Sequence, residues 1–433
     1  MATKFFRHLI PGFLLLFIDI SQANWVQTSG PINESVHALA VKGTDLFAGS
    51  DVGGVFLSSD SGSFWAPVNN GLGNLNISSL FMSGADLFVG ANSSATGVVS
   101  GAFRTSDNGA SWTVVNTGLM ASAGGTIAVT SFCKIGTNLF AGASSGVYKS
   151  INNGSNWARA INGLNYNYLN ISSLFAHGTN LFIGNGQGVY RSTDTGASWT
   201  QVNNGLTDTI VPNSYVLSFA AINTILFAGT LDSGVFRSSN NGAFWTAINR
   251  GLGNPPPRFI QSLFVNGANL FAGTDQGAFY SSDSGGSWKK FSDGLINRDV
   301  RSFAVIGSNL FAGTGPAGYF GGYAGVWIRS LAGLTPVAVR PSQVMSVDFE
   351  WERNIVGVIR PGEKLEFKVN RQAAIKLNVY DAMGTKIATL VNAVLTPGAY
   401  HAAFDASLWT GGLYFFRLQA GGLNLTRKIV LVK

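Results

Sequence analysis

Cysteine and charge are both scarce in this chain. It has one cysteine, Cys133, in 433 residues, and only 11% of its residues are charged. A single cysteine excludes an internal disulfide, so the fold must rest on its hydrophobic cores. Cys133 lies in an apolar segment (129–135) and is interpreted as a small buried hydrophobic residue rather than a reactive thiol.

Long apolar runs and clustered charges are also missing. Beyond the N-terminus, no segment is apolar over the length of a transmembrane helix, and no long amphipathic helical pattern occurs. The formal charge is +7, but the basic residues are scattered singly, which argues against a nucleic-acid partner. We expect neither metal nor cofactor, because the histidines beyond residue 23 form no zinc-ligand pattern and no catalytic triad: His37, His177 and His401.

The N-terminus has the order of segments that is typical of a secretory signal peptide. Lys4 and Arg7 precede a short apolar stretch (9–18), and small residues follow up to Ala23. The apolar stretch is too short to span a bilayer comfortably. We therefore expect residues 1–23 to be removed by cleavage between Ala23 and Asn24.

One short pattern, Ser/Thr-x-Asp/Asn-x-Gly-x-x-Trp, recurs six times in a sequence that is rich in glycine (55) and phenylalanine (31). Successive tryptophans of the pattern are 42 to 47 residues apart, a period typical of propeller blades. The acidic or amide residue and the tryptophan of the six copies are Asp60 and Trp65, Asp107 and Trp112, Asn152 and Trp157, Asp194 and Trp199, Asn240 and Trp245, and Asp283 and Trp288.

These copies resemble the Asp-box repeat of sialidases, xyloglucanases, sortilin-type receptors and photosystem II assembly-factor propellers. The Asp or Asn accepts backbone hydrogen bonds at a turn, the glycine tolerates positive φ, and the tryptophan packs into the blade. Asn152 and Asn240 can make the same turn bonds, but a neutral amide is unsuited to metal binding or acid–base chemistry. We therefore interpret the twelve residues as structural.

Two further motifs recur seven times, so we predict seven blades. A second strand carries Leu-Phe-x-Gly, and a third begins with Gly followed by two apolar residues. The seventh copy ends at Ser330 without a box, whereas residues 24–28 align with the strand around Trp199. The sequence therefore predicts an all-β fold in which residues 24–330 form a seven-bladed β-propeller closed by the N-terminal strand.

The character of the chain changes after residue 330. We expect a linker over residues 331–344 and a small Ig-like β-sandwich over residues 345–433, because short strand patterns alternate with turn signals there. Four stretches closely resemble the C-terminal sorting domain of the bacterial type IX (Por) secretion system: 377–384, 397–400, 412–418 and 428–433. The resemblance implies the type IX machinery as partner, export across the outer membrane, and attachment to the cell surface or release. The alternative is an Ig-like accessory domain without a sorting role.

The variation in loop length predicts where a ligand would bind. In four-stranded blades, loops between second and third strands share a face with the connections between blades, opposite the Asp-boxes. These loops are long at 90–101 and 313–325, and loops on a rigid scaffold often bind ligands. Our candidates for ligand contact, which could instead pack on the propeller, are Tyr319, Phe320, Tyr323 and Arg258.

We expect a non-catalytic surface protein that binds a glycan or a protein partner. Arg104, Arg191 and Arg237 occupy equivalent positions in separate blades, so they do not form the arginine triad of a sialidase. The alternative is a sialidase- or xyloglucanase-like glycoside hydrolase, which needs two carboxylates across a cleft. Candidate carboxylates on the face opposite the Asp-boxes are Asp51, Asp208, Asp232 and Asp275.

Overall fold

The computed structural model describes two compact units, residues 1–338 and residues 339–433, and the boundary falls inside the predicted linker. In the first unit the described residues are 24–92, 100–119, 127–206, 215–316, 323–332 and 334. In the second they are 349–351, 357–359, 364–369, 372–381, 385–396, 398–403, 409–420 and 423–431. No helix among these residues is long and apolar enough to cross a membrane.

The first unit is built from seven four-stranded antiparallel sheets. Their first strands are β2 (Val36–Lys42), β6 (Ile77–Ser83), β10 (Val129–Ile135), β14 (Ser173–His177), β18 (Val216–Ile222), β22 (Ile260–Asn266) and β26 (Val300–Ile306). The second strands are β3 (Asp45–Ser50), β7 (Asp86–Ala91), β11 (Asn138–Ala143), β15 (Asn180–Asn185), β19 (Ile225–Thr230), β23 (Asn269–Thr274) and β27 (Asn309–Thr314).

The outer half of each sheet follows the same order. The third strands are β4 (Val55–Ser58), β8 (Gly101–Thr105), β12 (Gly146–Ser150), β16 (Gly188–Ser192), β20 (Val235–Ser238), β24 (Gly277–Ser281) and β28 (Gly325–Ser330). The fourth strands are β5 (Ala66–Pro67), β9 (Thr113–Val114), β13 (Ala158–Arg159), β17 (Thr200–Gln201), β21 (Thr246–Ala247), β25 (Lys289–Lys290) and, in the last sheet, β1 (Val26–Ile32). A 3₁₀ helix, η1 (Tyr166–Tyr168), precedes β14.

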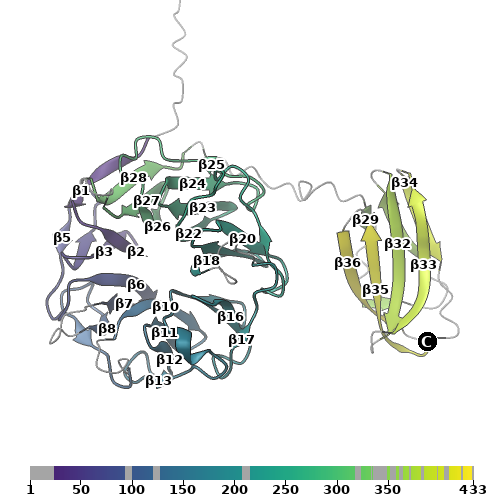
Figure 1. The fold of residues 1–433 in the computed structure, drawn as a ribbon, viewed down its shortest axis with the longest axis horizontal. Coiled ribbons are helices and arrows are strands. Elements are labelled where there is room, and N and C mark those ends of the chain that lie inside the picture. Colours follow the sequence, from purple (N-terminus) through teal and green to yellow (C-terminus); the bar gives the residue numbers. More distant parts are fainter. Residues whose placement is uncertain are drawn as a thin grey trace, which may run out of the picture. The chain divides into compact units, whose positions relative to one another are not determined.

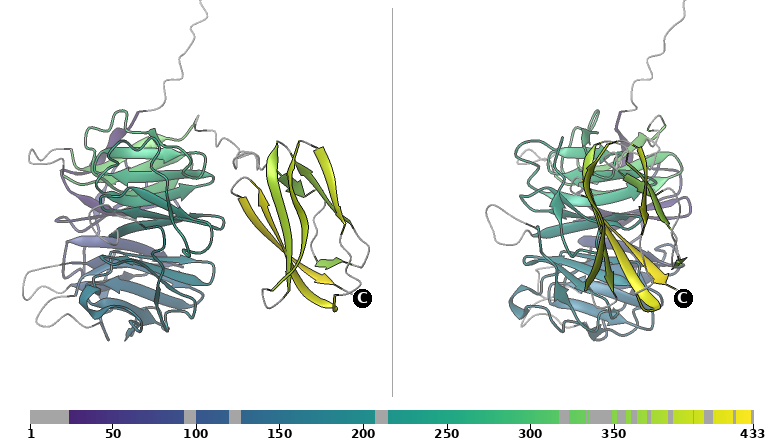
Figure 2. Two further views of the ribbon diagram at one scale, coloured as in Figure 1. Left: turned by 45° about the vertical axis from the view of Figure 1, so that its right-hand side comes forward. Right: turned by 90° about the vertical axis from the view of Figure 1, so that its right-hand side faces the viewer.

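The seven sheets stand around a common centre, with the first strands innermost (Figure 1). Each first strand contacts the first strand of the next sheet, and β26 contacts β2, so the sheets form a closed ring. Figure 2 shows the same ring from the side. The second strands are buried on both sides because hydrophobic cores fill the spaces between neighbouring sheets.

The antiparallel order gives the ring two faces. The connections between third and fourth strands, which hold the Asp-boxes, lie at one face, here called the Asp-box face. The loops between second and third strands and the connections between sheets lie at the other, here called the variable face. Lys42, at the end of β2, donates to Asn108 of a box at 2.6 Å, as expected for groups at one face.

The fourth strands are shorter than the sequence indicates. In the first sheet the sequence predicts a fourth strand over Phe64–Val68, and the ladder covers only Ala66–Pro67. The box tryptophan explains the difference, because its backbone N–H is directed toward the preceding sheet: Trp112 N–H donates to the Asn70 carbonyl at 2.8 Å. The indole of Trp112 also donates to that sheet, to the Val68 carbonyl at 2.7 Å. These residues therefore join two sheets instead of lengthening one.

The N-terminal segment completes the last sheet. β1 pairs with β28 in antiparallel register, with Val26 opposite Ile328. Trp25 makes the contacts of a box tryptophan, because its backbone N–H donates to Asp293 and its indole to Phe291, at 2.8 and 2.6 Å. The ring is thus joined at its ends by the same contacts that join its other sheets.

The second unit has two sheets that share one hydrophobic core. A three-stranded sheet contains β29 (Phe349–Trp351), β31 (Lys364–Val369) and β34 (Gly398–Ala403). A five-stranded sheet contains β30 (Gly357–Ile359), β36 (Leu423–Leu431), β35 (Gly412–Ala420), β32 (Ala373–Asp381) and β33 (Lys386–Leu395). Val369 and Ala402 of the first sheet pack in a cluster with Leu377 and Phe416 of the second. β30 pairs parallel with β36.

Candidate functional site

The Asp-boxes are turns whose polar groups bond one another. In the second sheet, Asp107 Oδ1 accepts from Thr105 Oγ1 at 2.5 Å and from the Ser111 N–H at 3.0 Å, while Gly109 N–H donates to Thr105 Oγ1. Hydrogen bonds from Ser111 and Thr105 lower the pKa of Asp107 to about 2. Asn152 accepts the equivalent bonds, from Ser150 and the Asn156 N–H at 2.9 Å. In these boxes the side-chain oxygens of Asp107 and Asn152 therefore accept hydrogen bonds from within their own turns.

The Asp-box face is further tied together between sheets. Arg104 and Arg191, from the third strands, donate to the carbonyls of Asn153 and Asn241 in the next box, at 3.1 and 2.9 Å. Asn153 in turn donates to Asp86 at 2.5 Å. Two of the three arginines considered for a sialidase site therefore hold neighbouring sheets together.

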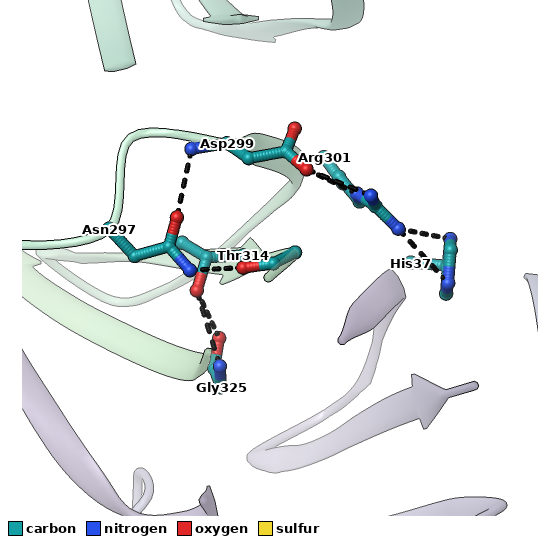
Figure 3. A network of polar contacts seen from close by, with 7 residues as sticks. His37, Asn297, Asp299, Arg301, Thr314 and Gly325 are labelled. Carbon is teal, nitrogen blue, oxygen red and sulfur yellow. Dashed lines mark hydrogen bonds and ion pairs between the residues drawn. The ribbon is translucent and has the colours of Figure 1, made fainter. Parts of the chain in front are cut away.

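On the variable face, a polar cluster joins the seventh sheet to the first (Figure 3). Arg301 of β26 lies between Asp299 and His37 of β2: its Nη2 is 2.8 Å from Asp299 Oδ2, and its Nη1 is 3.1 Å from His37 Nε2. Both side chains of the ion pair are about one-fifth exposed. Burial, and then the positive charge of Arg301, lower the pKa of His37 to about 4. His37 is therefore neutral at pH 7 and accepts a hydrogen bond from Arg301.

Neighbouring polar groups hold this cluster in place. Asn297 accepts from the Asp299 N–H at 3.0 Å and donates to the Gly315 carbonyl. Among the described residues nothing donates to the buried Oδ1 of Asp299, or to that of Asp51, whose negative charge acts on His37. The cluster therefore contains one guanidinium and two carboxylates, each with a buried oxygen that accepts no hydrogen bond from the described residues.

The histidine makes stability depend on pH in a direction that can be tested. Because its pKa is about 4 when folded and 6.5 in an unfolded chain, the unfolded state binds more protons between these values. The free energy of unfolding is therefore expected to fall as the pH drops from about 6.5 to 4. Urea titrations at several pH values should show a shallower decrease for His37→Gln than for the unchanged protein. Equal decreases would contradict the lowered pKa of His37.

A second cluster on the variable face lies between the fifth and sixth sheets. Arg258, a predicted ligand residue, forms an ion pair with Asp232 at 3.2 Å, and its guanidinium lies 5.2 Å from the ring centre of Phe259. Asp275 Oδ1 accepts from the Phe259 N–H at 3.2 Å. The two carboxylates thus flank one segment, and both have partners within the protein.

The predicted ligand residues are not brought together by any described contact. Tyr323 is 55% exposed at the start of the segment before β28, while Arg258 precedes β22. No hydrogen bond or ring contact between described residues joins these two side chains. Tyr319, Phe320, Asp208 and Ala23 lie outside the described residues. Among the described residues, no group of three or more His, Cys, Asp or Glu could hold a metal ion.

Sequence reasoning missed the His37–Arg301 pair and a recurring Gly-Leu motif. At the positions of three other repeats that align with His37 and Arg301, the sequence has Ser78, Thr130 or Ser172, so an alignment of the repeats would have singled out His37 and Arg301. The Gly-Leu motif follows the fourth strand, and each of its glycines lies against the backbone of the next box tryptophan or of Trp25: Gly71, Gly118, Gly163, Gly205, Gly251 and Gly294.

Comparisons with known proteins agree with this architecture. Residues 362–433 match the family described as the secretion system C-terminal sorting domain. Three solved structures resemble the chain: PorZ of the type IX secretion system of Porphyromonas gingivalis, YCF48 from Cyanidioschyzon merolae, and an ancestral GH74 enzyme. A search of curated proteins finds no significant match.

The structural likeness extends over most of the chain at low identity. PorZ has a TM-score of 0.51 and 14% identity over 92% of this chain, which spans 59% of PorZ. YCF48 has a TM-score of 0.51 and 15% identity, with 71% of this chain and 99% of YCF48 covered. The GH74 enzyme has a TM-score of 0.54 and 13% identity, with 94% and 63% covered. At such identities the likeness concerns the fold alone.

Together these findings define a class of protein. The chain is a β-propeller protein with a C-terminal sorting domain of the type IX secretion system. A domain of this kind directs its protein to the secretion machinery, and hence to the cell surface or the surroundings. The neighbours include both enzymes and non-enzymes, so the activity has to be argued from the site.

Proposed function

We propose that this chain is a non-catalytic binding protein of the cell surface or the surroundings. Its ligand, a glycan or a protein, binds at the variable face of a seven-bladed propeller closed by the N-terminal strand. Residues 1–23 act as the signal peptide, and the C-terminal sandwich is Ig-like. The seven sheets, the pairing of β1 with β28 and the sorting-domain match support this proposal.

One observation carries the non-catalytic part of the proposal: charged groups on both faces already have partners within the protein. Asp232 and Arg258 pair with each other, as do Asp299 and Arg301, and Arg104 holds the next Asp-box. A hydrolase needs a carboxylic acid and a carboxylate that are both directed at one bond. Binding needs only a rigid face with polar and aromatic groups, which the variable face supplies.

The similarity of fold to known proteins also supports a binding role. PorZ is described as a surface component of type IX secretion, and one YCF48 structure is of that protein bound to D1 peptide. Both neighbours share the fold of this chain without sharing more than 15% of its residues. They support a binding role by analogy, and the ligands named for them are theirs.

A glycoside hydrolase is the second candidate, and one observation favours it. Asp51 and Asp299 each have a buried carboxylate oxygen that accepts no hydrogen bond from the described residues. Both flank the His37–Arg301 pair on the variable face. A glycoside hydrolase of the common type needs two carboxyl groups on opposite sides of the bond that it cleaves.

Adsorption and turnover measured in one experiment separate the two candidates. The exported full chain is incubated with insoluble polysaccharides and with outer-surface extracts, and both bound protein and released reducing sugar are measured. We expect adsorption without sugar release, and equal adsorption by an Asp51→Asn/Asp299→Asn double variant. Sugar release that disappears in the double variant would replace the binding proposal with the hydrolase.

A further inference from the structure

The variable face carries a pair of tyrosines that flank a glycine. Tyr168 closes η1, in the connection before β14, and Tyr215 precedes β18 in the connection after the fourth sheet. Gly186 lies in the hairpin turn between β15 and β16. A Cβ placed on Gly186 would be 3.1 Å from Cε2 of Tyr215 and 3.7 Å from Cδ1 of Tyr168. Both rings therefore pack closely against the turn at Gly186, and a side chain at this position would displace the ring of Tyr215.

Hydrogen bonds fix Tyr168 in this position. Its backbone N–H donates to the Asn165 carbonyl at 3.0 Å, and its own carbonyl accepts from Asn185 Nδ2 at 2.8 Å. Asn185 is completely buried and also accepts from the Gln187 N–H at 2.8 Å, which fixes the hairpin turn. Tyr168 is nevertheless 44% exposed. An exposed ring on a fixed backbone loses little conformational entropy when a ligand stacks on it.

Tyr215 is held from the neighbouring sheet. Its carbonyl accepts from the Leu231 N–H at 2.9 Å, so the two tyrosines are tied to the fourth and the fifth sheet. Its side chain is partly exposed. Backbone hydrogen bonds thus hold the two tyrosines against two neighbouring sheets.

The chemistry around the rings selects a neutral ligand. The described segments that form the site contain no charged residue: Asn165–Asn170 reads Asn-Tyr-Asn-Tyr-Leu-Asn, and 185–187 reads Asn-Gly-Gln. Aromatic faces attract the weakly positive C–H groups of a sugar ring, and amides serve as both donors and acceptors for hydroxyls. Anionic sugars would need a cationic partner, and none of these segments supplies one.

From this arrangement we infer that Tyr168 and Tyr215, which both pack against Gly186, form a binding site for a neutral pyranose unit of a glycan, which stacks on the exposed parts of the tyrosine rings. The inference rests on the proposed binding function and gives it a ligand class and a location. The ligand is therefore expected to bind at the junction of the fourth and fifth sheets, and not at Tyr323 or Arg258.

Glycan-array binding by the exported full chain tests this site. The probes are immobilised neutral oligosaccharides (cello-, manno- and xyloglucan-oligosaccharides) and, for comparison, sialyllactose and oligogalacturonate. We expect neutral probes to bind and the charged ones to bind less. Tyr168→Ala and Tyr215→Ala should each weaken binding at least about tenfold, as truncated aromatic anchors do. Gly186→Val keeps both tyrosines but would displace the ring of Tyr215, and should weaken binding similarly.

The controls separate a lost site from a lost fold. Tyr323→Ala removes an exposed tyrosine elsewhere on the variable face and should bind as the unchanged protein does. All variants should have unchanged circular dichroism and thermal midpoints. Neutral-glycan binding that is lost in Tyr323→Ala but kept in the Tyr168 and Tyr215 variants would overturn this site and leave the binding function standing. Binding of proteins alone would also overturn the site, whereas sugar release would overturn the binding function itself.

Discussion

Gly118→Ala is expected to lower the free energy of unfolding by about 3 kcal/mol or more, because strain and a lost backbone hydrogen bond add up. Gly118 has φ +89°, and a Cβ there would lie 1.9 Å from the Trp157 carbonyl oxygen. The backbone must move, and the 2.8 Å bond from Trp157 N–H to the Thr117 carbonyl is lost with it. Chemical denaturation followed by tryptophan fluorescence measures the change.

Gly136→Ala is the matched control for this prediction. Gly136 also has positive φ, +56°, but nothing lies within 4 Å of a Cβ placed there. Its replacement should lower the free energy of unfolding by only about 1–2 kcal/mol, the penalty for an alanine in the left-handed backbone conformation. If both variants lost the same stability, the contact with the tryptophan backbone would contribute nothing and the joint between sheets would be incorrectly described.

Trp25→Ala is expected to lower the free energy of unfolding by about 3–5 kcal/mol, the usual effect of truncating a buried tryptophan. Trp25 is 2% exposed, its ring meets Phe291 edge-on at 6.0 Å, and its indole donates to the Phe291 carbonyl. Since Trp25 precedes the strand that joins the last sheet to the rest, its loss should also let β1 detach from β28. Limited proteolysis should then cut near the N-terminus before it cuts the ring.

Val26→Ala tests whether this effect is specific to the joint. Val26 lies next to Trp25 in β1 but is 61% exposed, so its replacement should change stability by less than about 0.5 kcal/mol. Early cleavage in both variants would mean that β1 is loosely held even with its tryptophan. Early cleavage in neither would mean that the pairing of β1 with β28 suffices to hold the segment.

The sequence alone predicted the repeated elements well, for a physical reason. Each repeat combines the two-residue period of a strand with turn residues of restricted conformation, so the same local preference recurs up to seven times along the chain. The sequence also predicted that residues around Trp25 would behave like those around Trp199, and the structure pairs β1 with β28. The length of the fourth strand was wrong because its tryptophan bonds the neighbouring sheet, a contact that no local pattern encodes.

The candidate sites were much less predictable. His37 and Arg301 meet across 264 residues of sequence, because the ring brings the first repeat against the last. Tyr168 and Tyr215 come together through a glycine in a third segment. In both cases the residue types are ordinary, and only the arrangement of the sheets gives them a common location. Loop length directed attention to Tyr323 and Arg258, whereas the contacts of Tyr168 and Tyr215 with Gly186 involve three separate segments of the chain.

The way the ring is joined also constrains the order of events during folding. Thr28 donates to the Val326 carbonyl at 2.9 Å across 298 residues, so the final pairing needs both ends of the repeat array. A chain that is synthesised from its N-terminus can stack its early repeats, but β1 remains unpaired until the last repeat is complete. Closing so large a loop carries an entropic cost that is offset only when the whole repeat array is in place. Until then, the free edges of β1 and of the newest sheet are the parts of the molecule most exposed to mispairing and proteases.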